Sequence, residues 1–566
     1  MTEFNPKLDR VREMCRKLKP VLGPQVEQLF LAYRVEDEEG KEQIEAYLDV
    51  LAAQHLPQGV DDSGVDLVPP TREQAHGDYT VGHVVYGGKS LFDFGIREKE
   101  CIQHIACFGR TGAGKTNLGF ILFQEFLRKG KPVLVFDWKR NYRDLLAMSD
   151  FQDVEVYTIG GGVSPLTFNP LIPPPGIKPK TWLKKIIQVI AHAYMLGNGV
   201  LYLLQQSLDA IYEEFGIYSG RVERYPTFRD VLAKLKDYNA RGREAGWLSS
   251  TLRALASLCF GDMDSLVNEG NNQMLDHLLQ KSAILELDTL TQSDKVFFVQ
   301  ALMLWLHHRR MMEGEREVFK HAVFIEEAHQ VLSNERQSLL GGQSVMDITF
   351  REIREFGECM VLFDQHPSEI SLPALGNTYT TITLNLKHAK DVGTMAQAML
   401  LEGDEKNLLG ALKVGEAVVK VQGRVPKPFL IRIPEFPIRK GVVDDAMVQA
   451  RMSPVLNSLR PGGTAGITAV DTRESCDSDD DGPPSIEERF LLDIGQHPDS
   501  GVAERYKRLG LSVRQGQKLK AYMLAKELVT ETQDHTKTGR LNRIRLTEKG
   551  ERFLRDSGNS RSRAQG

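Results

Sequence analysis

Short apolar runs alternate with amphipathic stretches through the middle of this chain. Residues 104–108, 322–325 and 359–363 are nearly continuous apolar runs, whereas residues 117–127 carry apolar side chains at three- and four-residue steps. Continuous runs of this length are typical of strands buried on both faces, and the second spacing is that of a helix with one buried side. Residues 281–445 repeat the alternation, which predicts an α/β core with a parallel sheet.

The regions outside the core have different patterns. Residues 1–80 place apolar side chains at helical spacing among many charges, which predicts a helical N-terminal region. Within a core of residues 81–452, residues 176–280 read as a mostly helical insertion. Residues 453–484 are rich in Gly, Ser, Asp and Pro and predict an acidic, flexible linker, whose charge is most simply explained by solubility.

The C-terminal region has the element order of a winged helix. Residues 485–557 suggest three helices, two alternating strands and a closing helix, followed by a disordered tail at 558–566. Residues 485–566 contain 17 Lys and Arg against 11 Asp and Glu, although the whole chain has a net charge of −5. A basic module on an acidic body suggests contact with DNA phosphates, and a winged helix that binds protein is the alternative. The candidate contacts are Arg514, Gln517, Lys518, Lys520 and Arg540.

The strongest chemical signal is the pattern G-x-x-x-x-G-K-[ST] at residues 109–116, between a predicted strand and a predicted helix. Its glycines let the backbone amides wrap a triphosphate, and the helix N-terminus favours negative charge. Lys115 is expected to reach the β- and γ-phosphates, and Thr116 to ligate Mg²⁺. The motif therefore predicts a RecA-like P-loop core that binds ATP and Mg²⁺ through Gly109, Arg110, Thr111, Gly112, Ala113, Gly114, Lys115 and Thr116.

Two carboxylates follow the second apolar run. Glu326 and Glu327 end the predicted strand 322–325, which is the Walker B arrangement when a P-loop is present. Glu326 is expected to hold Mg²⁺, usually through water, because magnesium dehydrates reluctantly. Glu327 is expected to orient and deprotonate the attacking water. The alternative is an ordinary acidic pair at the end of a strand.

Three further residues are candidates for the reaction. Gln365 follows the third apolar run, where it can sense a γ-phosphate or the attacking water. Arg351 and Arg354 precede that run, and one of them is expected to enter the site of a neighbouring subunit as an arginine finger. A solvated helix face with Glu/Arg pairs is the alternative, and the sequence does not choose between the two arginines.

Together these motifs resemble the HerA branch of the HerA/FtsK ATPases. The resemblance runs from Gly109 to about Pro434 and also rests on Val133–Lys139, Phe168–Leu171, Ile284–Asp288, Asp364–Ile370 and Gly415–Ala417. It implies a hexameric, ATP-driven translocase that encircles double-stranded DNA, often working with a nuclease or another effector. The residues on matching functional positions are Lys115, Thr116, Glu326, Glu327, Gln365 and Arg351.

The chain also departs from that family. The family commonly begins with a small β-barrel, which the helical region 1–80 replaces, so the docking of a nuclease on the barrel does not carry over. His366 stands where the family more usually has an arginine, so the contacts of that arginine do not carry over either.

Bulk properties agree with a globular protein that acts in the cytoplasm. The chain is 41% hydrophobic and 26% charged, it has no apolar run long enough to span a membrane, and its N-terminus lacks a secretory pattern. The expected function is an ATP-hydrolysing DNA translocase or helicase, in one version an anti-phage ATPase with a nuclease or NAD-consuming partner. The alternatives are a nucleotide-gated scaffold that assembles an effector without translocating, and a conjugation or secretion ATPase.

Overall fold

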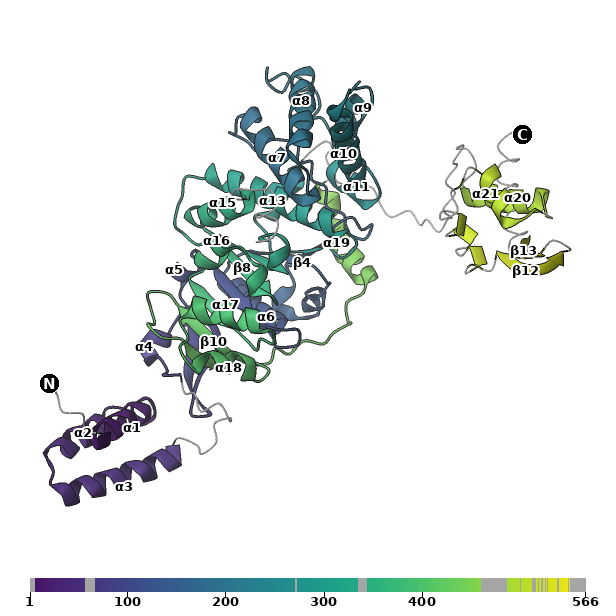
Figure 1. Cartoon of the computed structure of the whole chain (residues 1–566). Coiled ribbons are helices and arrows are strands. Elements are labelled where there is room, and N and C mark those ends of the chain that lie inside the picture. Colours follow the sequence, from purple (N-terminus) through teal and green to yellow (C-terminus); the bar gives the residue numbers. More distant parts are fainter. Residues whose placement is uncertain are drawn as a thin grey trace. The chain divides into compact units, whose positions relative to one another are not determined.

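A computed structural model describes residues 6–55, 67–269, 272–333, 344–459 and, with short gaps, 486–549. The chain divides into two compact units, residues 1–464 and 465–566, which are described separately (Figure 1). No helix within these described ranges has the length and apolar character needed to cross a membrane.

Three helices form the start of the first unit. They are α1 (Pro6–Leu22), α2 (Gln25–Val35) and α3 (Glu38–His55), and their buried side chains form a small core of their own. The predicted N-terminal helices are therefore present, although the chain enters the large sheet at Tyr79, just before the expected end of this region at residue 80.

Among the described residues, eleven strands form one sheet in the order β2-β1-β11-β10-β9-β3-β8-β7-β4-β6-β5. The seven strands from β9 to β5 are parallel, as the sequence predicted, because each is linked to the next along the chain by helices. The other four are antiparallel, which the sequence did not predict. The strand bounds are β1 Tyr79–Tyr86, β2 Lys89–Ile96, β3 Ile105–Phe108, β4 Val133–Asp137, β5 Glu155–Thr158, β6 Ala283–Glu286, β7 His321–Glu326, β8 Glu358–Asp364, β9 Thr380–Thr383, β10 Glu416–Val421 and β11 Phe429–Arg432.

Strand β8 lies between β3, which precedes the P-loop, and β7, which ends in the acidic pair. Phe108 is in register with Asp364, and Glu326 with Phe363, so the three strands end at one edge. Ligands of open parallel sheets bind at the carboxyl ends of the strands. The topology therefore brings together three motifs that are far apart in the sequence.

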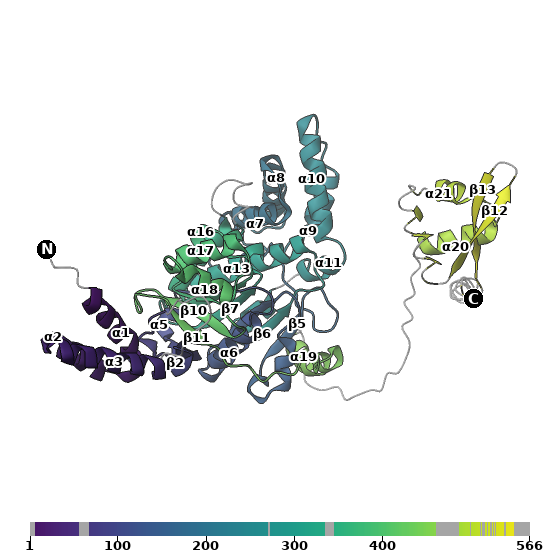
Figure 2. The same ribbon diagram turned by 60° about the horizontal axis from the view of Figure 1, so that its bottom comes forward.

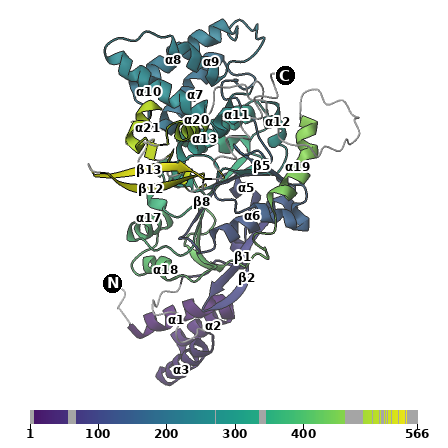
Figure 3. The ribbon, with the colours of Figure 1, turned by 90° about the vertical axis from the view of Figure 1, so that its right-hand side faces the viewer.

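Helices cover the sheet and form the insertion. Figures 1, 2 and 3 show α7 to α11 grouped at one end of the first unit, away from β1 and β2. The core helices are α4 Arg72–Ala75, α5 Glu98–Cys101, α6 Lys115–Arg128, α13 Gln292–Met311, α15 Val345–Glu352, α16 Leu372–Gly376, α17 Ala389–Met399 and α18 Glu405–Ala411. The insertion contains α7 Pro179–Tyr194, α8 Asn198–Glu214, α9 Phe228–Lys236, α10 Arg243–Leu258, α11 Asp262–Val267 and α12 Gln273–Leu278.

Helix α19 (Asp445–Leu459) extends past residue 453, where the linker was expected to begin. Val448 and Met452 of α19 are buried, and the Val156 N–H of β5 donates to the Met452 sulfur at 3.4 Å. The helical spacing of these apolar residues stabilises the helix against the core, so the linker boundary was placed too early. Residues 460–485 lie outside the described residues.

The second unit contains α20 (Ile486–Gln496), α21 (Val502–Arg508) and a hairpin of β12 (Val529–Thr536) and β13 (Gly539–Leu546). Its core includes Phe490, Tyr506 and Ile544. The fully buried Arg505 pairs with Asp493 at 2.8 Å. Much of the predicted third helix and the predicted closing helix lie outside the described residues, so the winged helix remains a prediction.

Candidate nucleotide site

A pocket of about 620 Å³ lies at the carboxyl edge of β3, β4, β7 and β8. Its walls come from the P-loop, from the turn after β4, from the acidic pair after β7, from the residue after β8 and from a segment after β11. The residues that line it are Thr111, Gly112, Gly114, Lys115, Thr116, Asn117, Phe120, Trp138, Lys139, Asn141, Glu326, Glu327, Gln365, Glu435, Phe436, Ile438 and Lys440.

The P-loop wraps the N-terminus of α6. Gly112 and Gly114 have φ angles of 77° and 112°, which favour glycine, and α6 begins at Lys115. The Lys115 ammonium donates to the Gly109 carbonyl at 2.6 Å, so it lies over its own loop. Burial lowers the pKa of Lys115, although the nearby carboxylates act in the opposite direction. An anion bound in the loop would replace the carbonyl as the partner of this ammonium.

The remaining predicted P-loop residues form the back of the loop. The Gly109 N–H donates to the Asp364 carbonyl at 3.1 Å, and Ala113 is buried. The Arg110 guanidinium donates to the Asn385 side chain at 2.7 Å. Gly109, Arg110 and Ala113 therefore shape the loop without lining the pocket.

Glu326 is the buried member of the acidic pair, with 7% of its surface exposed. One carboxylate oxygen accepts a hydrogen bond from the Tyr142 hydroxyl at 2.8 Å. Burial and, next, the charge of Asp137 raise the pKa of Glu326 to about 7. A divalent cation beside Glu326 would stabilise the ionised carboxylate and offset the unfavourable effect of burial. Magnesium commonly takes one or two carboxylates together with substrate phosphates, so the Thr116 hydroxyl and Glu326 fit Mg²⁺.

Glu327 takes part in a short chain of hydrogen bonds that leads to the P-loop. Its Oε1 accepts from the Gln365 amide at 2.8 Å and from the Lys139 ammonium at 2.5 Å. The Gln365 amide oxygen in turn accepts from the Thr111 hydroxyl of the P-loop. Glu327 has a φ of 50°, a left-handed value that is uncommon for residues other than glycine. The structure thus joins the predicted base, the predicted sensor and the P-loop.

Asp364 and His329 hold the turn that carries Glu327 in place. The Asp364 carboxylate is fully buried and accepts hydrogen bonds from the His329 N–H at 2.6 Å and from its Nδ1 at 2.8 Å. Burial opposes the charging of His329, but the bond to Asp364 outweighs it and raises the His329 pKa. The last residue of β8 therefore fixes the turn that carries Glu327.

One wall of the pocket was not predicted from the sequence. Residues 434–445, here called the strap, return to the P-loop after β11. The Asn117 amide donates to the Pro434 carbonyl at 2.8 Å, and its oxygen accepts from the Phe436 N–H at 2.7 Å. The Phe436 ring packs against Phe120, with 5.6 Å between centroids. Only the asparagine directly after Lys115-Thr116 offered a signal, and its partners are more than 300 residues away.

Arg351 and Arg354 lie elsewhere. Both are exposed, neither lines the pocket, and within the described part of the chain neither guanidinium group has a hydrogen bond or ion pair with another side chain. They precede β8, whereas Gln365 follows it. The seven residues of β8 separate the two edges by roughly 20 Å at about 3.3 Å per residue. Neither arginine can reach the nucleotide pocket of its own chain.

A glycine-rich loop between a strand and a helix, an acidic pair at the end of another strand and an amide directly after the strand between them define a RecA-like P-loop ATPase. Residues 79–187 match the family described as "Helicase HerA, central domain". This match, together with the geometry of the site, supports a HerA-type ATPase.

Relatives align with more of the chain than the family model does. A probable helicase of Methanocaldococcus jannaschii is 22% identical over 417 residues, which cover 72% of this chain and 75% of the relative. The DNA double-strand break repair helicase HerA of Sulfolobus acidocaldarius is 22% identical over 383 residues, or 64% of this chain and 70% of the relative. Among solved structures, VirB4 of Thermoanaerobacter pseudethanolicus aligns with a TM-score of 0.49 and 16% identity, over 64% of this chain and 97% of that chain.

Proposed function

We propose that this chain is the ATP-hydrolysing subunit of a ring, a homo-hexamer, that moves along double-stranded DNA. The observation that carries the proposal is the pocket that joins Lys115 and Thr116 of the P-loop to Glu326, Glu327 and Gln365. The names of the two relatives, both helicases, support movement on DNA as the work that hydrolysis drives.

The geometry supports a direct hydrolytic mechanism. The Lys115 ammonium would bind the β- and γ-phosphate oxygens, and the residues that would hold Mg²⁺ are Thr116 and Glu326. Mg²⁺ held there would supply positive charge that neutralises the phosphate oxygens. Gln365 and Glu327 position a water in line with the γ-phosphorus. The water oxygen forms a bond to phosphorus, the bond to the β-phosphate oxygen breaks, and ADP leaves. Glu327 takes the water proton.

The position of the two arginines supports a ring. Arg351 and Arg354 are exposed and lie at the opposite sheet edge from the pocket of their own chain. Heterologous contacts between identical subunits place one edge of a subunit against a different edge of the next, and they close into rings. In such a ring one of these guanidinium groups stabilises the charge that develops at the neighbour's γ-phosphate.

In addition to DNA, this protein would bind a second protein, its effector. The N-terminal helices α1 to α3 stand where the family commonly has its β-barrel, so an effector of this protein must use a different docking surface. We propose that the effector is a nuclease or an NAD-consuming enzyme, and in one version of the proposal the two proteins act in anti-phage defence. The basic second unit would contact DNA phosphates or this effector.

The test is movement on DNA. The full-length protein with ATP and Mg²⁺ should displace a third strand from a triplex at the end of a duplex, and duplex DNA should stimulate ATP turnover. Lys115→Ala should abolish both activities. ATP turnover that is insensitive to DNA and displaces no strand would reject the motor and leave the nucleotide-gated scaffold.

A further inference from the structure

The segment Asp137-Trp138-Lys139 has no role in the hydrolytic mechanism proposed above. Lys139 nevertheless contacts Glu327, the proposed general base of that mechanism. The Lys139 ammonium lies 2.5 Å from Oε1 of Glu327. The Lys139 side chain is 58% exposed, whereas that of Glu327 is 14% exposed. An exposed cation is therefore paired with a largely buried carboxylate, the proposed general base.

The backbone that carries Lys139 is fixed by Asp137. One carboxylate oxygen of Asp137 accepts from the Lys139 N–H at 3.0 Å, and the other accepts from the Tyr142 N–H at 2.9 Å. Asp137 is fully buried at the end of β4, which pairs directly with β7. The start of the turn after β4 is thus tied to the sheet.

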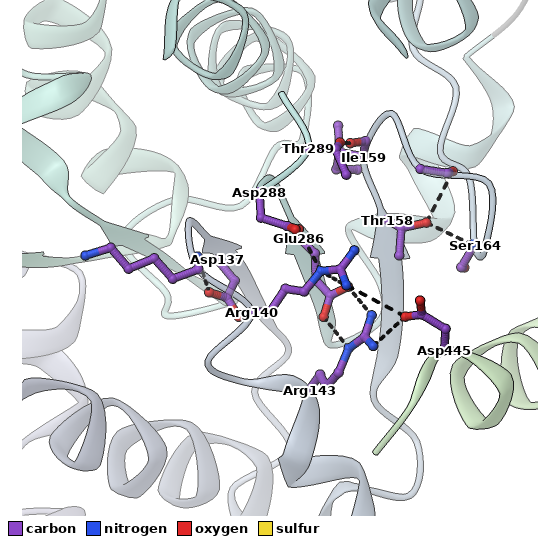
Figure 4. Close-up of polar contacts among 12 residues, drawn as sticks. Asp137, Arg140, Arg143, Thr158, Ile159, Ser164, Glu286, Asp288, Thr289 and Asp445 are labelled. Carbon is purple, nitrogen blue, oxygen red and sulfur yellow. Dashed lines mark hydrogen bonds and ion pairs between the residues drawn. The ribbon is translucent and has the colours of Figure 1, made fainter. Parts of the chain in front are cut away.

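Two arginines fix the rest of that turn. Arg140, at a φ of 57°, donates to Asp288 at 2.8 Å. The Arg143 guanidinium donates two hydrogen bonds to the carboxylate of the buried Glu286, at 2.7 and 2.6 Å, in a bidentate ion pair (Figure 4). Because the turn is held from both sides, the four-carbon side chain of Lys139 can change position while its backbone stays in place.

The pocket offers this cation two possible partners. Oε1 of Glu327 accepts from both Lys139 and Gln365, so the carboxylate is engaged before any water is positioned. A γ-phosphate brings more negative charge into the pocket that Lys139 lines. Lysine is a compact charge on a flexible stem, and hydrogen bonds between ionised groups are about twice as strong as neutral ones.

We propose that Lys139 is a switching cation, which binds Glu327 in the empty site and the γ-phosphate in the loaded site. A triphosphate then releases the general base, whereas a diphosphate leaves it engaged. The inference rests on the proposed function, because it requires this pocket to bind ATP. The competing interpretation is that Lys139 and Glu327 form an ordinary surface ion pair, which contributes little to folding stability and has no role in nucleotide binding.

The first experiment compares two nucleotides. Binding of ATPγS and ADP, each with Mg²⁺, is measured by calorimetry on the full chain and on Lys139→Met. We expect the affinity for ATPγS to fall about 10- to 100-fold and that for ADP to stay within about twofold, because methionine cannot donate a charge-assisted hydrogen bond to the γ-phosphate. Lys139→Arg should retain most of the affinity. Lys440→Met, at the strap end of the same pocket, should weaken both nucleotides to a similar extent.

A double-mutant cycle tests the transfer itself. Glu327→Gln removes the resting partner of Lys139, so it should strengthen ATPγS binding, and this gain should disappear when Lys139→Met is also present. A gain that persists would come from relieved repulsion alone and would overturn the switch. Equal reductions of ATPγS and ADP affinity in Lys139→Met would overturn it as well. If the unmodified chain binds neither nucleotide, the proposed function fails instead.

Discussion

At the scale of single residues, the predicted groups meet because each lies in the segment that follows a parallel strand. Lys115, Glu327 and Gln365 follow β3, β7 and β8, whose ends share one edge of the sheet. Lys139 follows β4 at the same edge, and its run Val133–Lys139 was part of the family resemblance, but the sequence did not indicate that Lys139 contacts Glu327. Motif spacing identifies residues that act on the ligand, whereas contacts between those residues depend on the order of the strands.

Replacing Glu327, the proposed general base, should separate ATP binding from ATP turnover. In Glu327→Gln the amide cannot accept the water proton, so kcat should fall about 10²- to 10⁴-fold while ATP remains bound. Single-turnover hydrolysis and equilibrium ATP binding provide the measurements. Glu315→Gln, an exposed residue before β7, is the matched control and should behave as the unmodified chain does. A normal rate in Glu327→Gln would remove Glu327 from the mechanism.

At the scale of elements, the sequence predicted the strands and helices whose signals are local. The P-loop strand and helix are confirmed as β3 and α6, because apolar periodicity and the glycine pattern lie within one short segment. The antiparallel edge of the sheet and the strap depend on pairings across hundreds of residues, and periodicity carries no information about such partners. The length of α19 was underestimated because the Gly- and Ser-rich sequence after it suggested that order ends early.

The junction of β3 and β8 should make the first unit sensitive to acid. His104 is fully buried, its Nδ1 accepts from the Met360 N–H at 3.1 Å, and its Nε2 lies 2.7 Å from the Phe350 carbonyl oxygen. Both nitrogens are used by the neutral ring, with Nε2–H donating to that carbonyl. Burial lowers the pKa of His104 to about 4 from its usual 6.5.

The sign follows from proton uptake by the unfolded chain. Between pH 6.5 and about 4 the unfolded state binds a proton that the folded state does not, so folding stability falls as the pH falls through this window. The decrease attributable to His104 is on the order of 3 kcal/mol. Its glutamine variant, His104→Gln, can keep both hydrogen bonds without titrating, so its unfolding temperature should depend less on pH. An identical pH dependence would show that His104 does not contribute.

At the scale of the whole molecule, activity should depend on contacts between copies. Arg351→Ala should lack the finger, and Lys115→Ala should lack a working P-loop, but each retains what the other lacks. Mixed rings should therefore recover part of the ATP turnover that neither protein has alone. The mixing series, repeated with Arg354→Ala, identifies the finger. If Arg351→Ala alone keeps the normal rate and mixing restores nothing, this arginine has no catalytic part.

Removing the second unit should spare hydrolysis. Every group assigned to hydrolysis lies before residue 441, so a chain ending at residue 464, which retains α19, should keep its basal ATP turnover. Its affinity for duplex DNA should fall, and the slope of log affinity against log salt should drop by about 0.9 for each phosphate that the shortened chain no longer neutralises. A salt titration of both chains measures this difference. Unchanged DNA binding and salt slope would assign the basic unit to protein contacts.

The strap is also the covalent route between the nucleotide pocket and the rest of the C-terminal chain. It starts at the clamp formed by Asn117, supplies Phe436 and Lys440 to the pocket, and continues into α19 through Asp445, which Arg143 binds at 2.6 Å. A pull on the second unit therefore reaches the pocket wall along the backbone. Mechanical load on that unit would change how long each nucleotide stays bound, so the strap would act as a tension sensor.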